Sequence, residues 1–537
     1  MTVPRPAVAL VALGLTLLGL ALMGLHHGLW TPDEPREAEI GREMLLTPAV
    51  IPTLDGQPFI EKPPLYYWTV AAAYRLSGGP SPLAARMVSA LAGLATLGLL
   101  LLWGTRGHSL LAGALAALML ATSVQFAVST HWILLDPLLM LFTTAAAWAA
   151  WQLLAGDDRA RWRIVLYAAL ILALWTKGPI GVVLVVAGVV AYVAVDRPRT
   201  WRNLRPVRGV LLLAAAVGLL AAAIGWQGGR PVLWEWFWVN QVDRLLHPLA
   251  RTGHRQPLLY YAWTLPWTVL PWLAPGIDAL RPSRWRRGNG AGNGTGAGPL
   301  WRFSALCSAG MLLVLSVAST KRETYLLPVL PLLFLWLGIH GAQWWSAWNE
   351  RAGGAGWTWW LQVVLLALVS LGAPLGVCLW LRRPWLPAVL WLAVAVACLL
   401  WLVWATVRGR CRHAGVAALG CAVIGMACVL SLAGPLLDGV KNMGPFVANL
   451  RPELPPGQPV YGTGVDETLR AIVPFYTGRR LVPLNPAQLR DPAFAQPAFI
   501  LVQDNHGAPV DLPPAYQLER RQAFGPGREL QWWRRQP

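Results

Sequence analysis

A series of long apolar runs, about thirteen in all, constrains the fold of this 537-residue chain more than any other feature. Hydrophobic residues make up 56% of the sequence and charged residues only 13%, whereas soluble domains carry roughly a quarter charged residues. A run of roughly 17 to 25 apolar residues can cross a bilayer as a helix. The sequence therefore predicts an all-α polytopic membrane protein with spans at 7–25, 83–103, 110–129, 133–154, 164–176, 180–195, 210–227, 260–280, 300–318, 325–341, 357–381, 386–407 and 414–436.

Arginine residues gather in three of the short loops between these runs, at 196–208, 281–302 and 408–412. The net charge of +19 would suggest nucleic-acid binding in a soluble protein, but arginines in such loops act as topology signals. Positively charged loops stay in the cytoplasm, and all three fall on one side when the spans are counted as above. The pattern predicts a cytoplasmic N-terminus, an external C-terminal tail and no nucleic-acid partner.

The composition changes after residue 436, where Pro, Gly and polar residues become frequent. Short runs typical of β-strands occur at 459–461, 499–503, 516–520 and 529–533, and 466–476 favours a helix. We therefore predict two domains. Residues 1–437 form the transmembrane domain, which includes an external loop, 26–82, with short amphipathic helices. Residues 438–537 form a small C-terminal α/β domain outside the membrane.

Charged residues are packed closely in the first external loop, although the chain as a whole is poor in charge. Asp33, Glu34 and Arg36 lie in one short stretch, and Glu61 and Lys62 lie in a second. Anchoring to a membrane needs none of these charges, so they indicate a reactive site at the membrane surface. Two simpler interpretations stay open, because the first stretch also fits the capped start of a helix and the second fits a surface ion pair.

Further ionisable residues lie near the predicted external ends of later spans. Asp136 lies just inside the fourth span, Lys177 follows the fifth, and Lys321 and Tyr325 lie at the start of the tenth. Ionisable residues at membrane depth are costly and indicate function by default. A buried hydrogen bond for Asp136 and a snorkelling Lys177 are the simpler alternatives. Mixed charges on one side of the membrane predict a cavity for a phosphorylated lipid and a reacting group.

Several of these residues form recognisable motifs. An acidic line runs over 33–44, and an EKPP-x-x-YW line runs over 61–68. In these lines the chain resembles the GT-C superfamily of membrane glycosyltransferases, specifically the branch with the lipid A aminoarabinose transferase and the bacterial relatives of protein O-mannosyltransferases. Shorter matches follow in order at 135–137, 176–179, 254–257 and 321–328.

The resemblance implies a transferase that moves a sugar from a polyprenyl-phosphate donor, such as undecaprenyl phosphate, to an acceptor. The acceptor would be lipid A, another glycan or a protein on the periplasmic face of the bacterial inner membrane. Roles follow residue by residue. The resemblance implies Asp33, Asp136 and Glu34 as catalytic residues, Arg36, Lys62, Lys177, Arg255 and Lys321 as ligands of the donor phosphate, and Tyr66, Tyr325 and His254 as residues that line the cavity.

A divalent metal cation is the one cofactor that the resemblance implies, with Glu61 as a ligand. Relatives carry a histidine near the position of Gln241. A neutral amide is a poor zinc ligand, so the chain departs from the family pattern at this position.

A transporter or flippase of polyprenyl-linked sugars is the alternative function. Transporters often carry charges at the bilayer midplane and internal repeats with broken helices. Here the charges gather on the predicted external side and no repeat is apparent, so the sequence favours an enzyme. This interpretation requires that Asp33, Lys62 and Asp136 converge in one pocket at the outer leaflet.

Overall fold

The structure is a computed structural model that describes residues 6–243, 255–282, 285, 298–350, 356–382, 385–485, 487–491, 496–505, 512–524 and 527–536. Its contacts divide the chain into two units. Unit 1 comprises Met1–Gly24 and Ser89–Leu432, and unit 2 comprises Leu25–Val88 and Ala433–Pro537. Two of the boundaries fall within long helices, α4 and α19.

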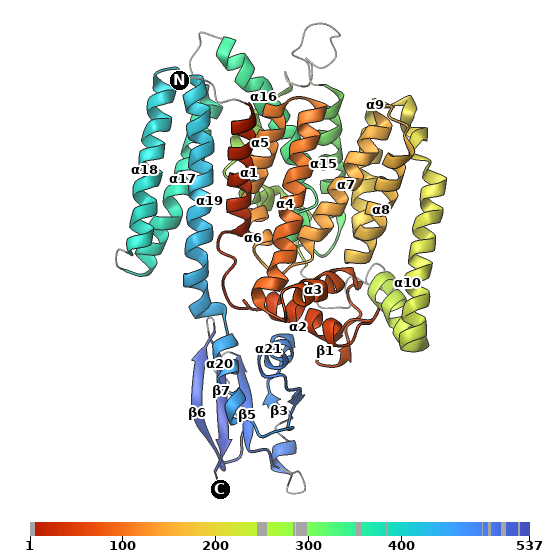
Figure 1. The fold of residues 1–537 in the computed structure, drawn as a ribbon, viewed down its shortest axis with the longest axis vertical. Helices are drawn as coiled ribbons and strands as arrows, with labels where there is room; N and C mark the ends of the chain where they lie inside the picture. The colour runs from red at the N-terminus through yellow and green to blue at the C-terminus, as the bar shows by residue number, and fades with distance from the viewer. Residues whose placement is uncertain are drawn as a thin grey trace. The chain divides into compact units, whose positions relative to one another are not determined.

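Unit 1 is helical (Figure 1). A membrane offers no water to the backbone, so apolar runs form helices there. In a helix, the backbone N–H and C=O groups hydrogen-bond within their own segment. The helical elements of this unit, together with the two that cross its boundaries, are α1 (Pro6–Leu22), α4 (Pro82–Gly107), α5 (Leu110–Ala121), α6 (Val124–Thr130), α7 (Asp136–Leu154), α8 (Ala160–Lys177), α9 (Ile180–Asp196), η1 (Arg199–Leu204), α10 (Pro206–Trp234), η2 (Glu235–Asp243), α12 (Tyr260–Thr268), α13 (Leu273–Ala279), α15 (Pro299–Val317), η4 (Glu323–Leu326), α16 (Leu330–Glu350), α17 (Trp357–Trp380), α18 (Leu386–Val407) and α19 (Cys411–Lys441).

Every predicted span contains a helix, which confirms the polytopic all-α fold. Within the described part of the chain, seven helices are long and apolar enough to cross a membrane. An eighth span results if α5 and α6, which bend by 66° at their junction, count as one. The helices α1 and α9 are also apolar but have only 17 residues each. The total of thirteen spans therefore stays a prediction.

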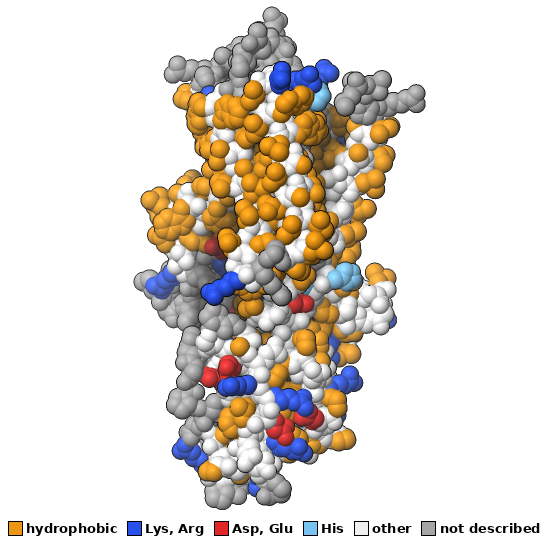
Figure 2. Space-filling model, turned by 90° about the vertical axis from the view of Figure 1, so that its left-hand side faces the viewer, with side chains coloured by type: hydrophobic (Ala, Val, Ile, Leu, Met, Phe, Trp, Pro, Cys, Tyr) orange, Lys and Arg blue, Asp and Glu red, His pale blue; other side chains and the backbone are white. Residues whose placement is uncertain are grey.

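Small residues let neighbouring helices of unit 1 approach closely. A Cβ atom added to Gly310 on α15 would lie 2.7 Å from the carbonyl oxygen of Ala187 on α9, and one added to Gly338 on α16 would lie 2.6 Å from the carbonyl of Ala112 on α5. Such contacts are typical of membrane helices, where packing replaces the hydrophobic effect. Figure 2 shows hydrophobic side chains over most of the visible helical face.

Unit 2 contains a five-stranded sheet in the order β4–β3–β5–β7–β6. The strands β4 (Leu481–Pro483), β3 (Val460–Thr463) and β5 (Phe499–Asn505) are parallel, whereas β7 (Arg528–Arg535) runs antiparallel to β5 and to β6 (Tyr516–Ala523). The predicted strands and the predicted helix, α21 (Glu467–Thr477), are confirmed. The sequence missed β4, which is too short to show an alternating pattern. The remaining short elements of this region are α20 (Gly444–Ala448), η5 (Arg451–Glu453) and η6 (Gln488–Arg490).

The first loop forms two short helices, α2 (Asp33–Leu46) and α3 (Leu65–Leu76), joined through the hairpin β1 (Thr53–Leu54) and β2 (Gln57–Pro58). A Cβ atom added to Gly41 of α2 would lie 2.4 Å from a methyl carbon of Val70 on α3, so glycine permits this crossing. The contacts group this loop with the C-terminal segment. The predicted domain boundary at residues 437 and 438 stays a prediction.

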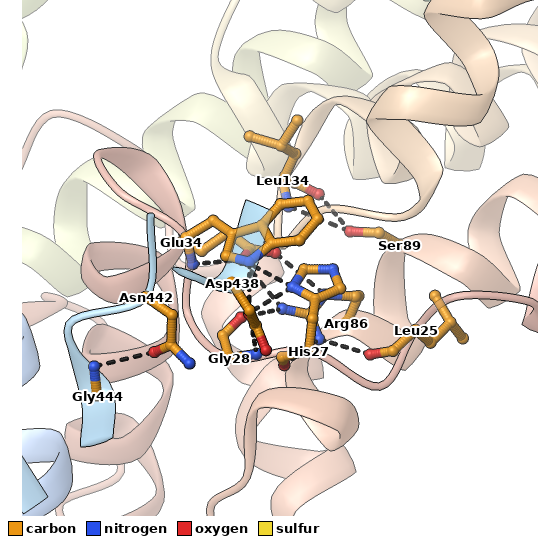
Figure 3. Close-up of polar contacts among 11 residues, drawn as sticks. Leu25, His27, Gly28, Glu34, Arg86, Ser89, Leu134, Asp438, Asn442 and Gly444 are labelled. Carbon is orange, nitrogen blue, oxygen red and sulfur yellow. Dashed lines mark hydrogen bonds and ion pairs between the residues drawn. The ribbon is translucent and has the colours of Figure 1, made fainter. Parts of the chain in front are cut away.

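A buried ion pair holds the start of α2 within unit 2 (Figure 3). Arg86 donates to both carboxylate oxygens of Glu34, at 3.1 and 3.0 Å, and both side chains are fully buried. The same guanidinium donates to the carbonyl oxygens of Leu25, His27 and Gly28 at 2.7, 3.2 and 2.9 Å. The N–H groups of Arg86 therefore hold the segment that leads into α2.

The end of α19 fixes the same segment from another direction. Asp438 accepts hydrogen bonds from the indole nitrogen of Trp30 at 2.7 Å and from the backbone nitrogen of Gly28 at 3.0 Å. The backbone nitrogen of Thr31 donates to the carbonyl of Lys441 at 3.2 Å. Residues more than 400 positions apart in sequence thus position the first turn of α2.

The Glu34–Arg86 pair predicts a large stability effect. We expect Arg86→Met to lower the free energy of unfolding by roughly 3–5 kcal/mol, because it leaves a buried carboxylate without its cation. The double variant Glu34→Leu/Arg86→Met should be more stable than Arg86→Met alone. Thermal unfolding of purified protein in detergent measures both effects. The control Arg520→Met, which breaks an exposed ion pair with Glu453, should cost at most about 1 kcal/mol. Equal losses of unfolding free energy in the Arg86 and Arg520 variants would contradict a stabilising role for the buried Glu34–Arg86 pair.

The arginine-rich loops predict the membrane orientation. We expect alkaline phosphatase fused after residue 537 to be active, because the C-terminal segment would lie outside the cytoplasm. The same reporter fused within the loop 196–208 of a truncated chain should be inactive, while green fluorescent protein fused there should fluoresce. The reverse pattern would overturn the predicted orientation.

Candidate active site

The acidic line begins at the first turn of α2. Asp33 is the first residue of this helix, and the residue before it, Pro32, makes no side-chain capping hydrogen bond. Glu34 accepts a hydrogen bond from the backbone nitrogen of Trp30 at 2.8 Å and binds Arg86. The structure thus gives Glu34 a structural role. Its catalytic role stays a prediction, and Asp33 is the better candidate because its side chain is not held in a fully buried pair.

Arg36 links three carboxylates at this turn, of which Asp33 and Glu37 are buried and Glu467 is exposed. Its guanidinium lies 3.1 Å from Asp33, 2.9 Å from Glu37 and 2.9 Å from Glu467 of α21. Burial opposes the charge of Arg36, but Glu37 and Asp33 raise its pKa above the ordinary value. Arg36 is therefore a permanent cation that orients Asp33, and most of its hydrogen-bonding capacity is already used.

A second pair on α2 belongs to the packing of the unit. Arg42 donates to both carboxylate oxygens of Glu39 at 2.7 Å. Burial raises the pKa of Glu39 to about 8, although Arg42 acts in the opposite direction. The hydroxyl of Tyr74 on α3 donates to the carbonyl of Ala38 at 3.0 Å in the same region. These contacts fix α2 on α3.

The second motif line places Glu61 and Lys62 just before α3. Their charged atoms lie 3.9 Å apart, and the two side chains are 43% and 25% exposed. This distance fits the simpler interpretation of a weak surface ion pair. Tyr66, predicted to line the cavity, is fully buried within α3 beside Tyr67, with ring centroids 5.6 Å apart. The donor-phosphate role of Lys62 and the cavity role of Tyr66 stay predictions.

Three predicted site residues come together in unit 1. The ammonium of Lys177 lies 2.5 Å from the carboxylate of Asp136 and 4.4 Å from the ring centroid of Tyr325, in η4. Asp136 begins α7 and Lys177 ends α8, so each charge also suits the helix dipole at its position. Gly178, with φ 81°, ends α8 directly after the lysine. The Asp136–Lys177 pair therefore joins the start of α7 to the end of α8.

The segment that contains Lys321 is tied to the segment before α12. Lys321 is buried and donates to the carbonyl of Gln256 at 3.1 Å, and burial lowers its pKa. Arg255 forms a backbone bridge with Thr320. The hydroxyl of Tyr260 donates to Glu323 at 2.6 Å. These contacts position the chain that leads to Tyr325.

Two further predictions concern the cavity residue His254 and the divalent metal. His254, predicted to line the cavity, lies outside the described residues. No three His, Cys, Asp or Glu side chains among the described residues lie close enough together to hold a metal ion. Glu61 has a lysine as its charged neighbour instead. These residues do not fit a metal site, so we assign no step to a metal, and the divalent cation stays a prediction.

Five of the predicted site residues thus form two clusters, one in each unit. Asp33 and Arg36 lie together in unit 2, and Asp136, Lys177 and Tyr325 lie together in unit 1. That both clusters act on one substrate stays a prediction. Sequence reasoning missed Arg86 and Asp438, which position α2, and Tyr260 and Tyr261, which hold the segment before Tyr325. A charged Arg86 inside an apolar predicted span was a usable signal.

Comparisons with known proteins agree with these motifs. The family model described as dolichyl-phosphate-mannose-protein mannosyltransferase matches residues 13–227. The chain is 33% identical over 329 residues to an undecaprenyl phosphate-alpha-4-amino-4-deoxy-L-arabinose arabinosyl transferase of Sodalis glossinidius, covering 59% of this chain and 55% of the relative. A protein of the same name from an Enterobacter strain is 28% identical over 79% of this chain and 76% of the relative. The match thus spans about half the length of the first relative.

One solved structure shows the fold. It is ArnT from Cupriavidus metallidurans bound to undecaprenyl phosphate, with a TM-score of 0.71 and 19% identity, and the alignment covers 98% of this chain and 97% of that protein. The fold is therefore shared over nearly the whole chain. The family model shows similarity in sequence over residues 13–227, which contain the two motif lines. The chain is therefore similar in fold to ArnT and similar in sequence, over part of its length, to the aminoarabinose transferases and to the protein mannosyltransferase family.

Proposed function

We propose that this chain is a glycosyltransferase of the bacterial inner membrane that moves a sugar from a polyprenyl-phosphate donor to an acceptor on the periplasmic face. The observation that carries the proposal is that charged residues of the motifs lie beside one another in the structure. The charged residues of the family-like motifs, Asp33 with Arg36 and Asp136 with Lys177, form two ion-paired clusters. The family model matches residues 13–227, which contain all four of these residues. Relatives named for undecaprenyl-phosphate sugar transfer are similar over 59% and 79% of this chain.

Lys177 is the best candidate to bind the donor phosphate. As the bond between sugar and phosphate breaks, negative charge grows on the departing phosphate, and a cation fixed in advance stabilises that charge. Asp136 and the ring of Tyr325 fix the Lys177 ammonium. Arg36 is less suited because three carboxylates already surround it, and Lys321 is committed to a backbone carbonyl.

Asp33 is the best candidate for the acidic catalytic residue. If the acceptor is a hydroxyl, the carboxylate acts as a base toward its proton. If the acceptor is a phosphate, little deprotonation is needed, and the carboxylate stabilises the positive charge that develops at the anomeric carbon. Attack from the side opposite to the departing polyprenyl phosphate would invert the anomeric configuration.

We further propose a pentose such as 4-amino-4-deoxy-L-arabinose as the sugar and lipid A as the acceptor. The names of the relatives support the sugar. The donor arrives already joined to a lipid, so the chain needs no nucleotide-sugar domain. The external C-terminal segment would control access of the acceptor.

Replacement of Asp33 tests the catalytic assignment. We expect Asp33→Asn to reduce sugar transfer by roughly 10²–10⁴-fold, the usual contribution of a positioned acid or base. Transfer from a labelled polyprenyl-phosphate sugar is measured in proteoliposomes. The control is Glu519→Gln, which changes a carboxylate on strand β6 and should retain activity. Wild-type turnover by a well-folded Asp33→Asn protein would contradict the assignment, and donor movement between leaflets without transfer would favour a flippase.

Replacement of Lys177 tests the phosphate assignment. We expect Lys177→Met to lower kcat by about 10²-fold, because the cation acts on charge that develops during the reaction. Lys177→Arg should recover part of the rate. The double variant Asp136→Asn/Lys177→Met removes the buried uncompensated carboxylate, so it separates loss of stability from loss of catalysis. An unchanged kcat in a stable Lys177→Met protein would refute the role of Lys177.

A further inference from the structure

A groove in unit 1 combines an apolar wall with a basic end. It lies between α8 and α10, which run beside each other (Figure 1), and has a volume of about 390 Å³. Ile164, Ile171 and Leu212 contribute apolar lining, and Arg163, Arg205 and Arg208 contribute the charges. The groove uses none of the residues assigned to sugar transfer.

The floor of the groove is fixed by contact between the two helices. The hydroxyl of Tyr167 on α8 donates to the carbonyl of Leu204 at 2.5 Å, just before α10. A Cβ atom added to Gly209 of α10 would lie 2.1 Å from the Tyr167 ring, so the ring rests directly on the backbone of α10. Only glycine permits this approach, and the groove is therefore a built feature of the helix pair.

The basic end carries positive charge that nearby carboxylates do not balance. Arg163 forms an ion pair with Asp158. Neither Arg205 nor Arg208 forms an ion pair with any other residue that the structure describes. Both side chains are exposed. Two cations beside an apolar groove suit a ligand that has a phosphate at one end and a hydrocarbon chain at the other.

The place of the groove narrows the choice of ligand. Arg205 directly precedes α10 and Arg208 lies in its first turn. Both belong to 196–208, one of the three arginine-rich stretches predicted to face the cytoplasm. Ile164 is 68% exposed and Leu212 is 49% exposed, as expected for side chains that meet lipid. The charges proposed to handle the sugar donor belong to the predicted external side. A basic pocket between membrane helices on the cytoplasmic side is typical of a site for an anionic lipid headgroup.

We propose that this groove binds an anionic phospholipid of the cytoplasmic leaflet, such as phosphatidylglycerol. Arg205 and Arg208 bind the phosphate, and one acyl chain lies along Ile164, Ile171 and Leu212. Bound lipid stabilises the contact between α8 and α10. A zwitterionic phospholipid carries no net charge for the two arginines to neutralise and binds more weakly.

The test compares lipids on the purified full-length protein. Phosphatidylglycerol or phosphatidylcholine is added in mixed micelles, and the melting temperature and the lipid retained in native mass spectrometry are measured. We expect phosphatidylglycerol to raise the melting temperature of the wild type more than phosphatidylcholine does. Arg205→Gln/Arg208→Gln should bind phosphatidylglycerol roughly 30-fold more weakly, which is about 2 kcal/mol for two basic side chains near a lipid phosphate. Ala168→Phe, which fills the groove without a change of charge, should have a similar effect.

A matched control separates the groove from general charge. Arg408→Gln/Arg412→Gln removes two arginines from another loop predicted to face the cytoplasm and should leave the lipid response unchanged. Equal responses of the wild type and the Arg205/Arg208 variant to phosphatidylglycerol would overturn the proposal, as would equal responses to the two lipids. Displacement of phosphatidylglycerol by equimolar undecaprenyl phosphate in the wild type, but not in the variant, would instead assign the groove to the donor and overturn it too.

Discussion

The buried pair between Glu34 and Arg86 is the interaction on which the candidate site depends most. Both charges are removed from water, so each is tolerable only because the other is present and because backbone carbonyls occupy the remaining donors of the arginine. This pair fixes the segment that enters α2, and Asp33 begins that helix one residue before Glu34. The most acidic part of the sequence is therefore held by a partner 52 positions away.

Sequence reasoning succeeded where a physical constraint acts locally. Asp136 and Lys177 stood out because charged side chains in apolar spans need a reason to be there, and the structure joins them at 2.5 Å. Their meeting follows from topology, because consecutive antiparallel helices bring the end of one span to the start of its neighbour. The apolar runs and the strands of the C-terminal segment were likewise visible, since periodicity and composition are properties of short windows.

It failed where the partner is distant in sequence or the element is short. Arg86 lies in a predicted span, but nothing near it indicates that Glu34 is its partner. Asp438 binds Gly28 and Trp30 across some four hundred residues, so grouping the first loop with the C-terminal segment could not be read from either stretch. The strand β4, Leu481–Pro483, is too short to show a period.

The central claim is that this chain transfers a sugar from a lipid phosphate and that Asp33 is needed for the transfer. The most direct measurement is mass spectrometry of lipid A, other glycans and exported proteins from cells that lack the chain, complemented with either the wild type or Asp33→Asn. The account predicts a mass increase of one sugar on a single class of acceptor with the wild type and no such increase with the variant. Identical spectra from all three strains under conditions of confirmed expression would contradict it.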